Sequence, residues 1–443
     1  MNILLKIFKV LAIILFLSAV SLVAYDYLST REAFPLGTYI SGMDVSLLSP
    51  EEAIKKIKTY PLAKIYTSLL TLEADHKTFT FPPDKLGVKV LYSETVNKTF
   101  ALSHKGNYFQ QLRARMGSGL INAPLVLDID EGQLNAVLET LVDEVRTSPK
   151  NASMVYYEIT GGYNIHADDP GRELNIKRSI VRFKVRLYQG DKVIPLVIDY
   201  RNPKITEEKL RKSPPAHRLA AYTTYYGSHD NPNRIHNIKL VASWIDSTIL
   251  LPGDIFSVAE ALGDVTEEQG FKEALVILKG ELVPTLGGGA CQIATTLYNT
   301  VSLADLKVLQ RRNHSFYFNI YPLGRDAAVY PGQVDFQFEN DTEYPIMIQA
   351  IATNKKLSFR IYGTPSGKEV KFSSPSILGK SAGGEYKPMP LKTVIDRDIP
   401  FKTSVTRTVY DKDGNQISEE VILSRYKLYG DKDNVPIRRP GEG

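Results

Sequence analysis

An uncharged apolar run at residues 10–25 limits what this chain can become more than any other feature of its sequence. Its sixteen residues would rise about 24 Å as a helix, slightly less than the roughly 30 Å hydrocarbon core of a bilayer. Lys6 and Lys9 precede the run and Tyr25 ends it, and such side chains extend a span into the interfaces. We therefore predict a cytoplasmic stub and a transmembrane signal anchor within residues 1–33.

A cleaved signal peptide is the alternative interpretation of the same run, because the small residues Ala19 and Ser21 form a weak cleavage site. Positive charge before the run keeps the N-terminus inside and sends the rest of the chain across the membrane. Both interpretations export the chain. With the anchor retained, the predicted location is the cell membrane, crossed once, with the bulk of the chain extracytoplasmic.

The composition argues against two classes of protein. Of the 443 residues, 43% are hydrophobic and 23% charged, which is typical of folded domains rather than of disorder, and the length favours two or three domains. The 54 basic and 49 acidic residues give a net charge of only +5. Nucleic-acid binding needs a concentrated basic patch, so we expect no nucleic-acid partner.

Residues 37–211 contain a faint internal duplication. Each half has a helical stretch, a strand-rich middle, a turn with glycine, another helix and a closing glycine. Gly87 and Gly106 are 19 positions apart, and so are Gly171 and Gly190. The matched spacing predicts two similar α+β lobes. Neither lobe shows a catalytic cluster, which favours a binding or spacer module.

The character of the sequence changes after Ser213, where two prolines break helix and strand alike. Residues 411–415, Asp-Lys-Asp-Gly-Asn, are typical of a hairpin turn. The periodicity beyond the prolines predicts helices at residues 237–249 and 295–309 and strands at 334–338 and 345–348. The predicted domains of this α+β chain are the duplicated module at 34–212, a mixed α+β catalytic domain at 216–365 and a β-rich extension at 366–443.

Cys291 is the only cysteine, so the chain cannot form an intramolecular disulfide in the oxidising space outside the cell. A glycine-rich loop precedes it and good helix formers follow. At a helix N-terminus, free N–H groups and the dipole lower the pKa of a thiol and can also hold an oxyanion. A small, inert, buried cysteine is the plain alternative, but the combination favours a nucleophile. The loop residues expected to contact substrate are Gly287, Gly288, Gly289, Ala290 and Gln292.

A cysteine nucleophile needs a base, and His314 is the best candidate because it follows the helix and opens a β-rich segment. Asp326 is the candidate to orient its imidazole. The alternatives are an ordinary loop histidine and a turn or cap aspartate. His229 and His236 are expected to be structural. No grouping of His, Cys and Asp has zinc spacing, so no metal and no cofactor are expected.

Several blocks of this sequence resemble the VanW domain, in the order of that family and over roughly residues 220–350. Two positions depart from the common pattern: Val258 follows Ser257 where a Ser-Phe-Asn run is common, and Ala290 stands where valine is frequent. The duplicated region is similar to the peptidoglycan-binding module that often accompanies VanW. The blocks are Leu251–Ser257, Gly287–Gln292, Thr295–Asn299, Arg312–Ser315, Tyr321–Ala327 and Asp335–Asn340.

The resemblance implies L,D-transpeptidase activity, which has been associated with VanW-type domains. Cys291 would attack the carbonyl of the third residue of a peptidoglycan stem peptide, release D-alanine and pass the acyl group to a neighbouring stem, forming a 3-3 cross-link. His314 would act as base, Asp326 would orient it, and Arg312 is a further candidate to bind substrate. The expected partners are stem peptides and the cell membrane, with the chain facing the cell wall. The alternatives are a non-enzymatic peptidoglycan-binding or scaffold protein of the cell envelope and a cysteine peptidase or amidase that uses water as acceptor.

Overall fold

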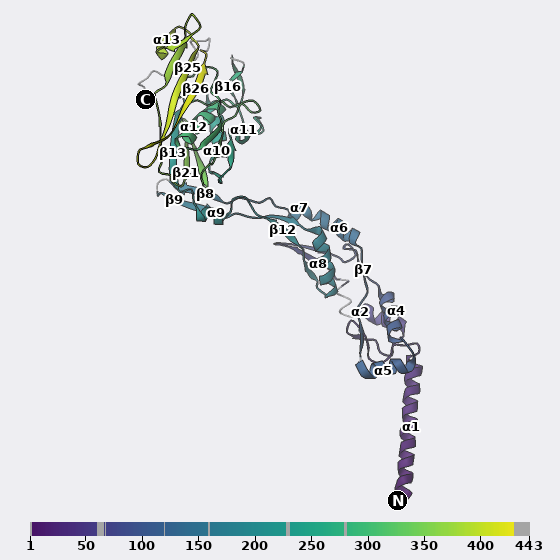
Figure 1. Cartoon of the computed structure of the whole chain (residues 1–443). Coiled ribbons are helices and arrows are strands. Elements are labelled where there is room, and N and C mark those ends of the chain that lie inside the picture. The colour runs from purple at the N-terminus through teal and green to yellow at the C-terminus, as the bar shows by residue number, and fades with distance from the viewer. Residues whose placement is uncertain are drawn as a thin grey trace. The chain divides into compact units, whose positions relative to one another are not determined.

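Figure 1 shows the computed structural model, which describes residues 2–59, 66, 68–118, 120–157, 160–226, 231–278 and 281–428. The chain divides into two compact units. Unit 1 comprises Met1–Pro149 and Pro170–Asn202, and unit 2 comprises Lys150–Asp169 and Pro203–Gly443. The chain combines helices with short sheets, so the predicted α+β class is confirmed. The domain limits proposed from the sequence stay predictions.

One helix, α1 (Asn2–Thr30), begins unit 1 and is drawn in purple in Figure 1. Its segment Leu5–Thr30 is long and apolar enough to cross a membrane, and it is not buried against the rest of the chain. The end of α1 is tied to helix α5 (Tyr108–Ser118), because Asp26 forms an ion pair of 2.9 Å with Arg115. The predicted apolar N-terminal helix is confirmed, and its retention as an anchor stays a prediction.

The two halves of the duplicated region repeat one order of elements: helix, hairpin, strand and helix. In the first half these are α2 (Pro50–Thr59), β3 (Leu70–Ala74), β4 (Lys77–Phe81), β5 (Val88–Val90) and α4 (Tyr92–Ser103). In the second half they are α6 (Glu131–Thr140) with α7 (Val142–Val145), then β8 (Ser153–Tyr157), β9 (Gly162–His166), β10 (Gly171–Leu174) and α8 (Ile176–Tyr188). The hairpin of the second half, β8 and β9, belongs to unit 2.

Short strands after each half pair with strands that come earlier in the chain. They are β6 (Ile121–Ala123) and β7 (Leu127–Ile129) after the first half, and β11 (Val193–Pro195) and β12 (Ile198–Arg201) after the second. A further hairpin, β1 (Thr38–Ile40) and β2 (Met43–Asp44), precedes both halves. β6 runs parallel to β1 as β11 runs parallel to β3, whereas β7 is antiparallel to β5 as β12 is to β10. The equivalent pairings support the duplication seen in the sequence.

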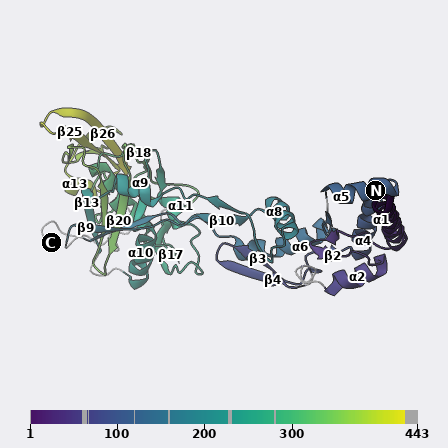
Figure 2. The ribbon, with the colours of Figure 1, turned by 90° about the horizontal axis from the view of Figure 1, so that it is seen from below.

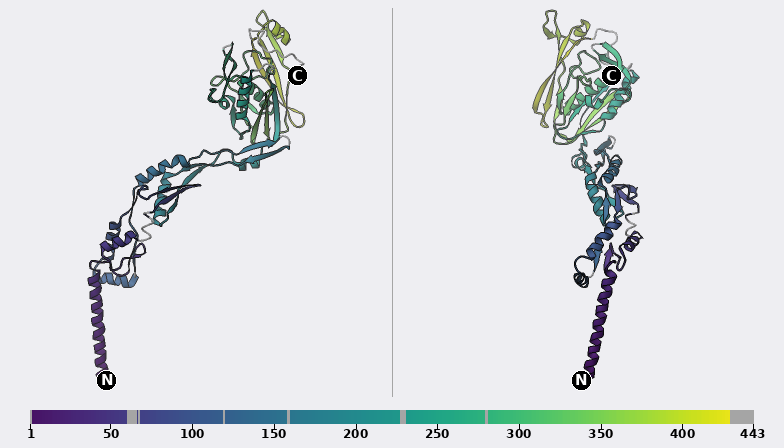
Figure 3. Two further views of the ribbon diagram at one scale, coloured as in Figure 1. Left: turned by 180° about the vertical axis from the view of Figure 1, so that it is seen from behind. Right: turned by 90° about the vertical axis from the view of Figure 1, so that its right-hand side faces the viewer.

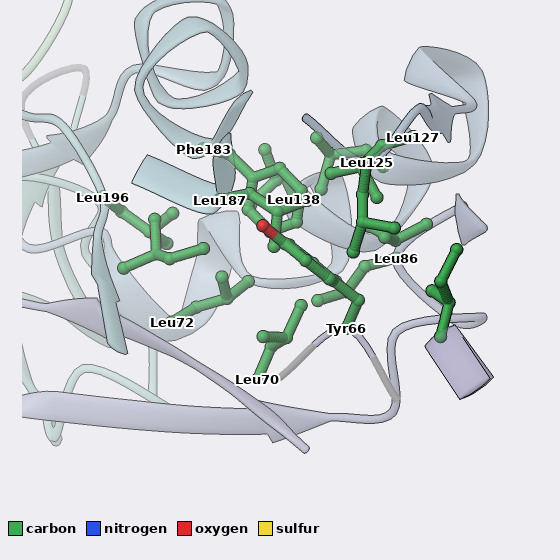
Figure 4. Packing of buried hydrophobic residues seen from close by; sticks show 14 of the residues in the cluster. Tyr66, Leu70, Leu72, Leu86, Leu125, Leu127, Leu138, Phe183, Leu187 and Leu196 are labelled. Carbon is green, nitrogen blue, oxygen red and sulfur yellow. The ribbon is translucent and has the colours of Figure 1, made fainter. Parts of the chain in front are cut away.

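Figure 4 shows the core of unit 1, where β3 of the first half meets α8 of the second. Leu70 and Leu72 alternate along the strand, and Phe183 and Leu187 lie one turn apart on the helix. All four side chains are fully buried. Each contributes about 1.5–3 kcal/mol by leaving water, so this core joins the two halves.

Unit 2 is built on an antiparallel sheet with strand order β13-β21-β20-β14. The strands are β13 (His217–Tyr225), β21 (Lys356–Gly363), β20 (Ile346–Ala352) and β14 (Thr248–Leu250). Helices α10 (Pro232–Ile245) and α12 (Ala290–Leu303) pack on one face, against which Ile346 and Ile348 point. Met347, between them, points to the other face, where β8, β9 and α9 (Glu207–Lys212) pack.

Smaller elements surround this sheet. They are the sheet of β15 (Ile255–Ser257), β19 (Gln337–Glu339) and β18 (Lys307–Gln310), helix α11 (Val258–Leu262), and the hairpin of β16 (Glu273–Leu278) and β17 (Glu281–Leu286). The C-terminal sheet contains β22 (Glu369–Phe372), β23 (Ser376–Lys380), β24 (Tyr386–Pro388), β25 (Phe401–Tyr410) and β26 (Gln416–Tyr426), with helix α13 (Leu391–Asp396). The predicted β-rich C-terminal region is thus confirmed.

The long hairpin of β25 and β26 is drawn in yellow-green in Figure 2, and both views in Figure 3 show it beside the green strands of the same unit. Its turn at residues 411–415 is closed by hydrogen bonds from the backbone N–H groups of Asp413 and Asn415 to the Asp411 carboxylate. The hairpin turn predicted there is confirmed.

Two predicted helices have different limits. α10 begins at Pro232 and ends at Ile245, not at 249, because Ser247 adopts a φ of 62° and β14 follows. α12 begins at Ala290 and ends at Leu303, because Asp305 adopts a φ of 56° and the chain continues as β18. A residue in the left-handed region stops a helix, and serine and aspartate give little warning of it in a sequence.

Candidate active site

Cys291 is the second residue of α12, at the helix N-terminus that the sequence predicted. The helix is capped by Gly289 at a φ of 111°, and Gly287 has a φ of 86°. Both values lie in the region that residues with a side chain rarely adopt, so the turn into the helix needs glycine there. The thiol is half-buried, and its Sγ lies 3.6 Å from the Val329 carbonyl oxygen.

The three glycines are also packed against the protein. A Cβ atom at Gly287 would lie 2.7 Å from Val265, one at Gly288 would lie 2.6 Å from Ala274, and one at Gly289 would lie 2.6 Å from Ile238. These distances are shorter than any real Cβ contact. Close packing therefore requires these glycines whether or not a substrate approaches, and their predicted substrate contacts stay a prediction.

His314 and Asp326 lie together beside this thiol, as the sequence reasoning expected. His314 Nδ1 is 2.6 Å from Asp326 Oδ2, and the His314 backbone N–H donates to the same oxygen at 2.7 Å. The imidazole also lies close enough to the Cys291 thiol for each group to shift the pKa of the other. Since Asp326 engages Nδ1, the other ring nitrogen is the one that serves the thiol. The three residues lie in the order that a nucleophile, a base and an orienting carboxylate would need.

Helix α12 also holds the segment that carries Asp326. The Thr295 hydroxyl donates to the Ala327 carbonyl at 3.0 Å. The same hydroxyl oxygen accepts from the Ala327 N–H, also at 3.0 Å. The Asn299 side chain donates to the Arg325 carbonyl at 2.8 Å. Both polar side chains are fully buried, so these bonds are protected from water. One helix thus places the nucleophile and fixes the residues on either side of the orienting carboxylate.

The C-terminal sheet completes the surroundings of Asp326, which the sequence analysis did not anticipate. The Tyr426 hydroxyl, on β26, donates to Asp326 Oδ1 at 2.5 Å. Arg311 donates to the Asp326 carbonyl at 2.8 Å and to the Ser424 hydroxyl at 3.1 Å. The carboxylate is therefore buried but well supplied with donors. Tyr426 is separated from Asp326 by 100 positions, and no local sequence signal connects them.

A second group missed by the sequence analysis surrounds Arg234 on α10. Arg234 Nη2 donates to Gln292 Oε1 at 2.6 Å, and its guanidinium is hydrogen bonded to the Tyr321 phenol. Tyr321 stacks on His314, with ring centroids 5.1 Å apart and planes at 17°. The group therefore connects α10 with both the residue after the nucleophile and the candidate base.

The remaining candidates occupy different positions. The Gln292 side chain is buried, and its amide nitrogen donates to the Thr224 hydroxyl at 2.9 Å. Arg312 is exposed, next to the half-buried Arg311. His236 Nε2 lies 2.9 Å from the Gly270 carbonyl, consistent with a structural role, and His229 lies outside the described residues.

The charges at the site favour a thiolate. Burial raises the pKa of Cys291, but the charge and hydrogen bond of His314, together with the Val329 carbonyl contact and the charge of Arg234, outweigh it, so the net pKa is lowered. Burial lowers the pKa of His314, but the Cys291 thiolate and the Asp326 carboxylate raise it above its usual range. Both shifts, the lowered pKa of the thiol and the raised pKa of the imidazole, favour a thiolate–imidazolium pair.

Two backbone amides near the thiol already have partners. The Ala290 N–H donates to the Gly287 carbonyl at 3.3 Å, and the Gln292 N–H donates to the Gly289 carbonyl at 3.0 Å. An oxyanion contact from Ala290 would replace its long, weak bond. Within the described ranges, no group of three His, Cys, Asp or Glu side chains is placed to hold a metal ion.

Comparison with known families defines the class of protein. Residues 233–362 match the family described as "VanW like protein". This range includes Cys291, His314 and Asp326. Residues 79–194 match the family described as "Putative peptidoglycan binding domain". The chain therefore carries a VanW-like domain and a second domain that matches the family of that description.

Two curated relatives share part of the chain. The "Uncharacterized protein YoaR" of Bacillus subtilis (strain 168) is 38% identical over 162 residues, which are 37% of this chain and 53% of that protein. The "Vancomycin B-type resistance protein VanW" of Enterococcus faecalis (strain ATCC 700802 / V583) is 25% identical over 162 residues, which are 35% of this chain and 59% of that protein. The chain thus spans somewhat more than half the length of these relatives. No solved structure matches it significantly.

Proposed function

We propose that unit 2 is an extracytoplasmic cysteine acyltransferase that acts on peptidoglycan stem peptides as an L,D-transpeptidase. The observation that carries this proposal is the group of Cys291, His314 and Asp326: the thiol lies at the start of a helix, and His314, which Asp326 holds at 2.6 Å, is close enough to the thiol to lower its pKa. The peptidoglycan-binding family match supports the class of substrate. A binding protein would have no need of a thiol whose pKa is lowered by a neighbouring histidine.

The chemistry follows from the pair of charges. The Cys291 thiolate forms a bond to the carbonyl carbon of the third stem residue, and the C–N bond to the terminal D-alanine breaks. The His314 imidazolium gives its proton to the leaving amine. The side-chain amine of a second stem then attacks the thioester, His314 takes its proton, and the thiolate leaves. Asp326 keeps the ring orientation throughout and stabilises the imidazolium.

A hydrolase is the nearest alternative, because water can attack the same thioester in place of an amine. The half-buried position of the thiol restricts water without excluding it. The products separate the two reactions: a transferase yields a cross-linked dimer with a 3-3 bond, and a peptidase or amidase yields the free tripeptide. A non-enzymatic binder yields neither.

We also propose that α1 is an uncleaved anchor in the cell membrane and that units 1 and 2 face the cell wall. Ala19 and Ser21, the weak cleavage site, lie within a continuous helix rather than in an extended segment. The helix continues to Thr30, whose carbonyl accepts a hydrogen bond of 2.8 Å from His104. Unit 1 then holds stem peptides or glycan near the membrane surface, as its family match suggests.

The acyl-enzyme gives the direct test of this function. The purified protein in detergent is mixed with disaccharide tetrapeptide and analysed by intact mass. We expect a mass increase equal to the disaccharide tripeptide acyl group, absent in Cys291→Ala, followed by its transfer to an added stem peptide. A protein that binds the muropeptide but never carries the acyl mass contradicts the proposal.

A further inference from the structure

Arg234 places a fixed positive charge beside the nucleophile. It is the third residue of α10, and its charge is close enough to the Cys291 sulfur to help lower the pKa of the thiol. An arginine side chain stays charged at any pH at which a protein is folded. Neither the sequence pattern nor the proposed acyl transfer assigns this residue a role.

The guanidinium is held in a defined orientation. Its Nη2 donates to Gln292 Oε1 at 2.6 Å, and the Gln292 amide is itself fixed because its nitrogen donates to Thr224 at 2.9 Å. Gln292 is only 1% exposed, so its amide is shielded from water. The Tyr321 phenol, also hydrogen bonded to Arg234, stacks on His314. A cation oriented by buried neighbours is suited to recognise a ligand group, because little freedom remains to be lost on binding.

The acyl donor would bring an anion to this position. In a peptide cleaved at its last bond, the terminal carboxylate lies one residue beyond the attacked carbonyl, or roughly 4 Å along the chain. The planar fork of arginine matches a carboxylate in shape and charge. Arg234 is hydrogen bonded to Gln292, the residue next to Cys291, at 2.6 Å, and Tyr321 stacks on the candidate base His314, so the guanidinium lies beside the candidate site.

We propose that Arg234 binds the C-terminal carboxylate of the acyl donor, so that the site selects stem peptides whose scissile bond is their last peptide bond. This inference rests on the proposed acyltransferase function and narrows it. It makes the site specific for donors with a free carboxylate and disfavours donors that are amidated or extended at that end.

The test combines two donors with two proteins. Disaccharide tetrapeptide with a free C-terminal carboxylate is compared with its C-terminal carboxamide, and the rate of acyl-enzyme formation on Cys291 is followed by intact mass. We expect the unaltered protein to prefer the acid by about 10- to 100-fold, the range of a charge-assisted hydrogen bond pair. In Arg234→Gln the preference should fall to nearly 1.

The ratio of the two rates isolates the contact. Losing Arg234 also weakens the thiolate and slows both donors, but this effect is the same for acid and amide and cancels in the ratio. Arg234→Lys keeps the charge without the planar fork and should give an intermediate ratio. Lys239→Gln removes one positive charge from the exposed side of the same helix and should keep the full preference.

Two results would overturn the inference: equal rates for acid and amide in the unaltered protein, or an acid preference that persists in Arg234→Gln. If no donor acylates Cys291, the acyltransferase proposal fails, and the inference is then decided by binding. Calorimetry with Cys291→Ala should still show tighter binding of the acid than of the amide, and equal binding would overturn the carboxylate contact as well.

Discussion

The hydroxyl of Tyr426 donates a 2.5 Å hydrogen bond to Asp326 Oδ1, while Oδ2 of the same carboxylate accepts from His314. The two residues come from different parts of unit 2: Asp326 lies in the segment held by α12, and Tyr426 ends β26 of the C-terminal sheet. The β-rich extension therefore supports the candidate active site directly. In the proposed mechanism its role is to hold the carboxylate that would orient the base.

Replacing Tyr426 by phenylalanine tests this support. The change removes one donor to a buried carboxylate, which costs about 1.5–3 kcal/mol for a bond to a charged group. We expect acyl-enzyme formation to slow by about tenfold or more, with the ring still packed against Phe401. The Tyr426 bond lowers the pKa of Asp326, so its loss should raise that pKa. As the pH is lowered, the variant should therefore lose activity at a higher pH than the unaltered protein does.

Tyr386→Phe, on an exposed strand of the same sheet, is the control. Equal rates and pH profiles for both variants would show that Tyr426 does not position the site.

The pH dependence of Cys291 alkylation tests the charge pair. The folded pKa of the thiol is lowered, so the thiolate should persist below the ~8.5 of a free cysteine and the alkylation rate should stay high toward neutral pH. In His314→Ala, burial remains but the histidine charge and hydrogen bond are lost, so the pKa of the thiol should rise. Alkylation at pH 7 should then fall by at least tenfold and recover only in alkaline solution. A thiol of the unaltered protein that titrates at or above the ordinary value contradicts the pair.

Unit 1 can be tested apart from the nucleophile. Phe183 is fully buried in the core of Figure 4, and its replacement by alanine should cost about 3–5 kcal/mol of unfolding free energy for this unit. We expect the full-length protein with Phe183→Ala to lose retention on purified sacculi while Cys291 alkylation is unchanged. Val181→Ala, on the exposed side of the same helix, is the matched control. Undiminished retention after unit 1 has unfolded would assign wall binding to another part of the chain.

The retained anchor predicts the N-terminus of the mature protein. The helix crosses the position of the weak cleavage site without interruption, so protein extracted from membranes should retain the residues that precede Leu22. N-terminal sequencing is the measurement. A mature chain that begins near Leu22 would remove the anchor but not export. Units 1 and 2 would then be released into the wall.

The sequence predicted the parts of this site that have local signals. A glycine loop before helix formers located Cys291, and the spacing of the following blocks located His314 and Asp326. Arg234 and Tyr426 carry no such signal, because their importance arises only when α10 and β26 fold beside α12. The same limit applies to Gln292, whose position next to the cysteine suggested substrate contact although its amide is turned into the protein. In the fold, the period-two pattern gave the right class at 345–348, but the strand predicted at 334–338 is a strand only at Gln337 and Phe338. The left-handed Ser247 and Asp305 set helix ends that no pattern indicated.

The central claim is that Cys291 forms a covalent acyl-enzyme with a peptidoglycan stem peptide. The most direct measurement is the intact mass of the full-length protein after reaction with disaccharide tetrapeptide, alongside Cys291→Ala and Cys291→Ser. On the unaltered protein we predict the added mass of the disaccharide tripeptide, located on Cys291 by peptide mapping. We predict no adduct on the alanine variant. The serine variant should carry little adduct, because a hydroxyl gains little from a site that stabilises a thiolate. Cross-links that still form at the native rate with Cys291→Ala would contradict the account.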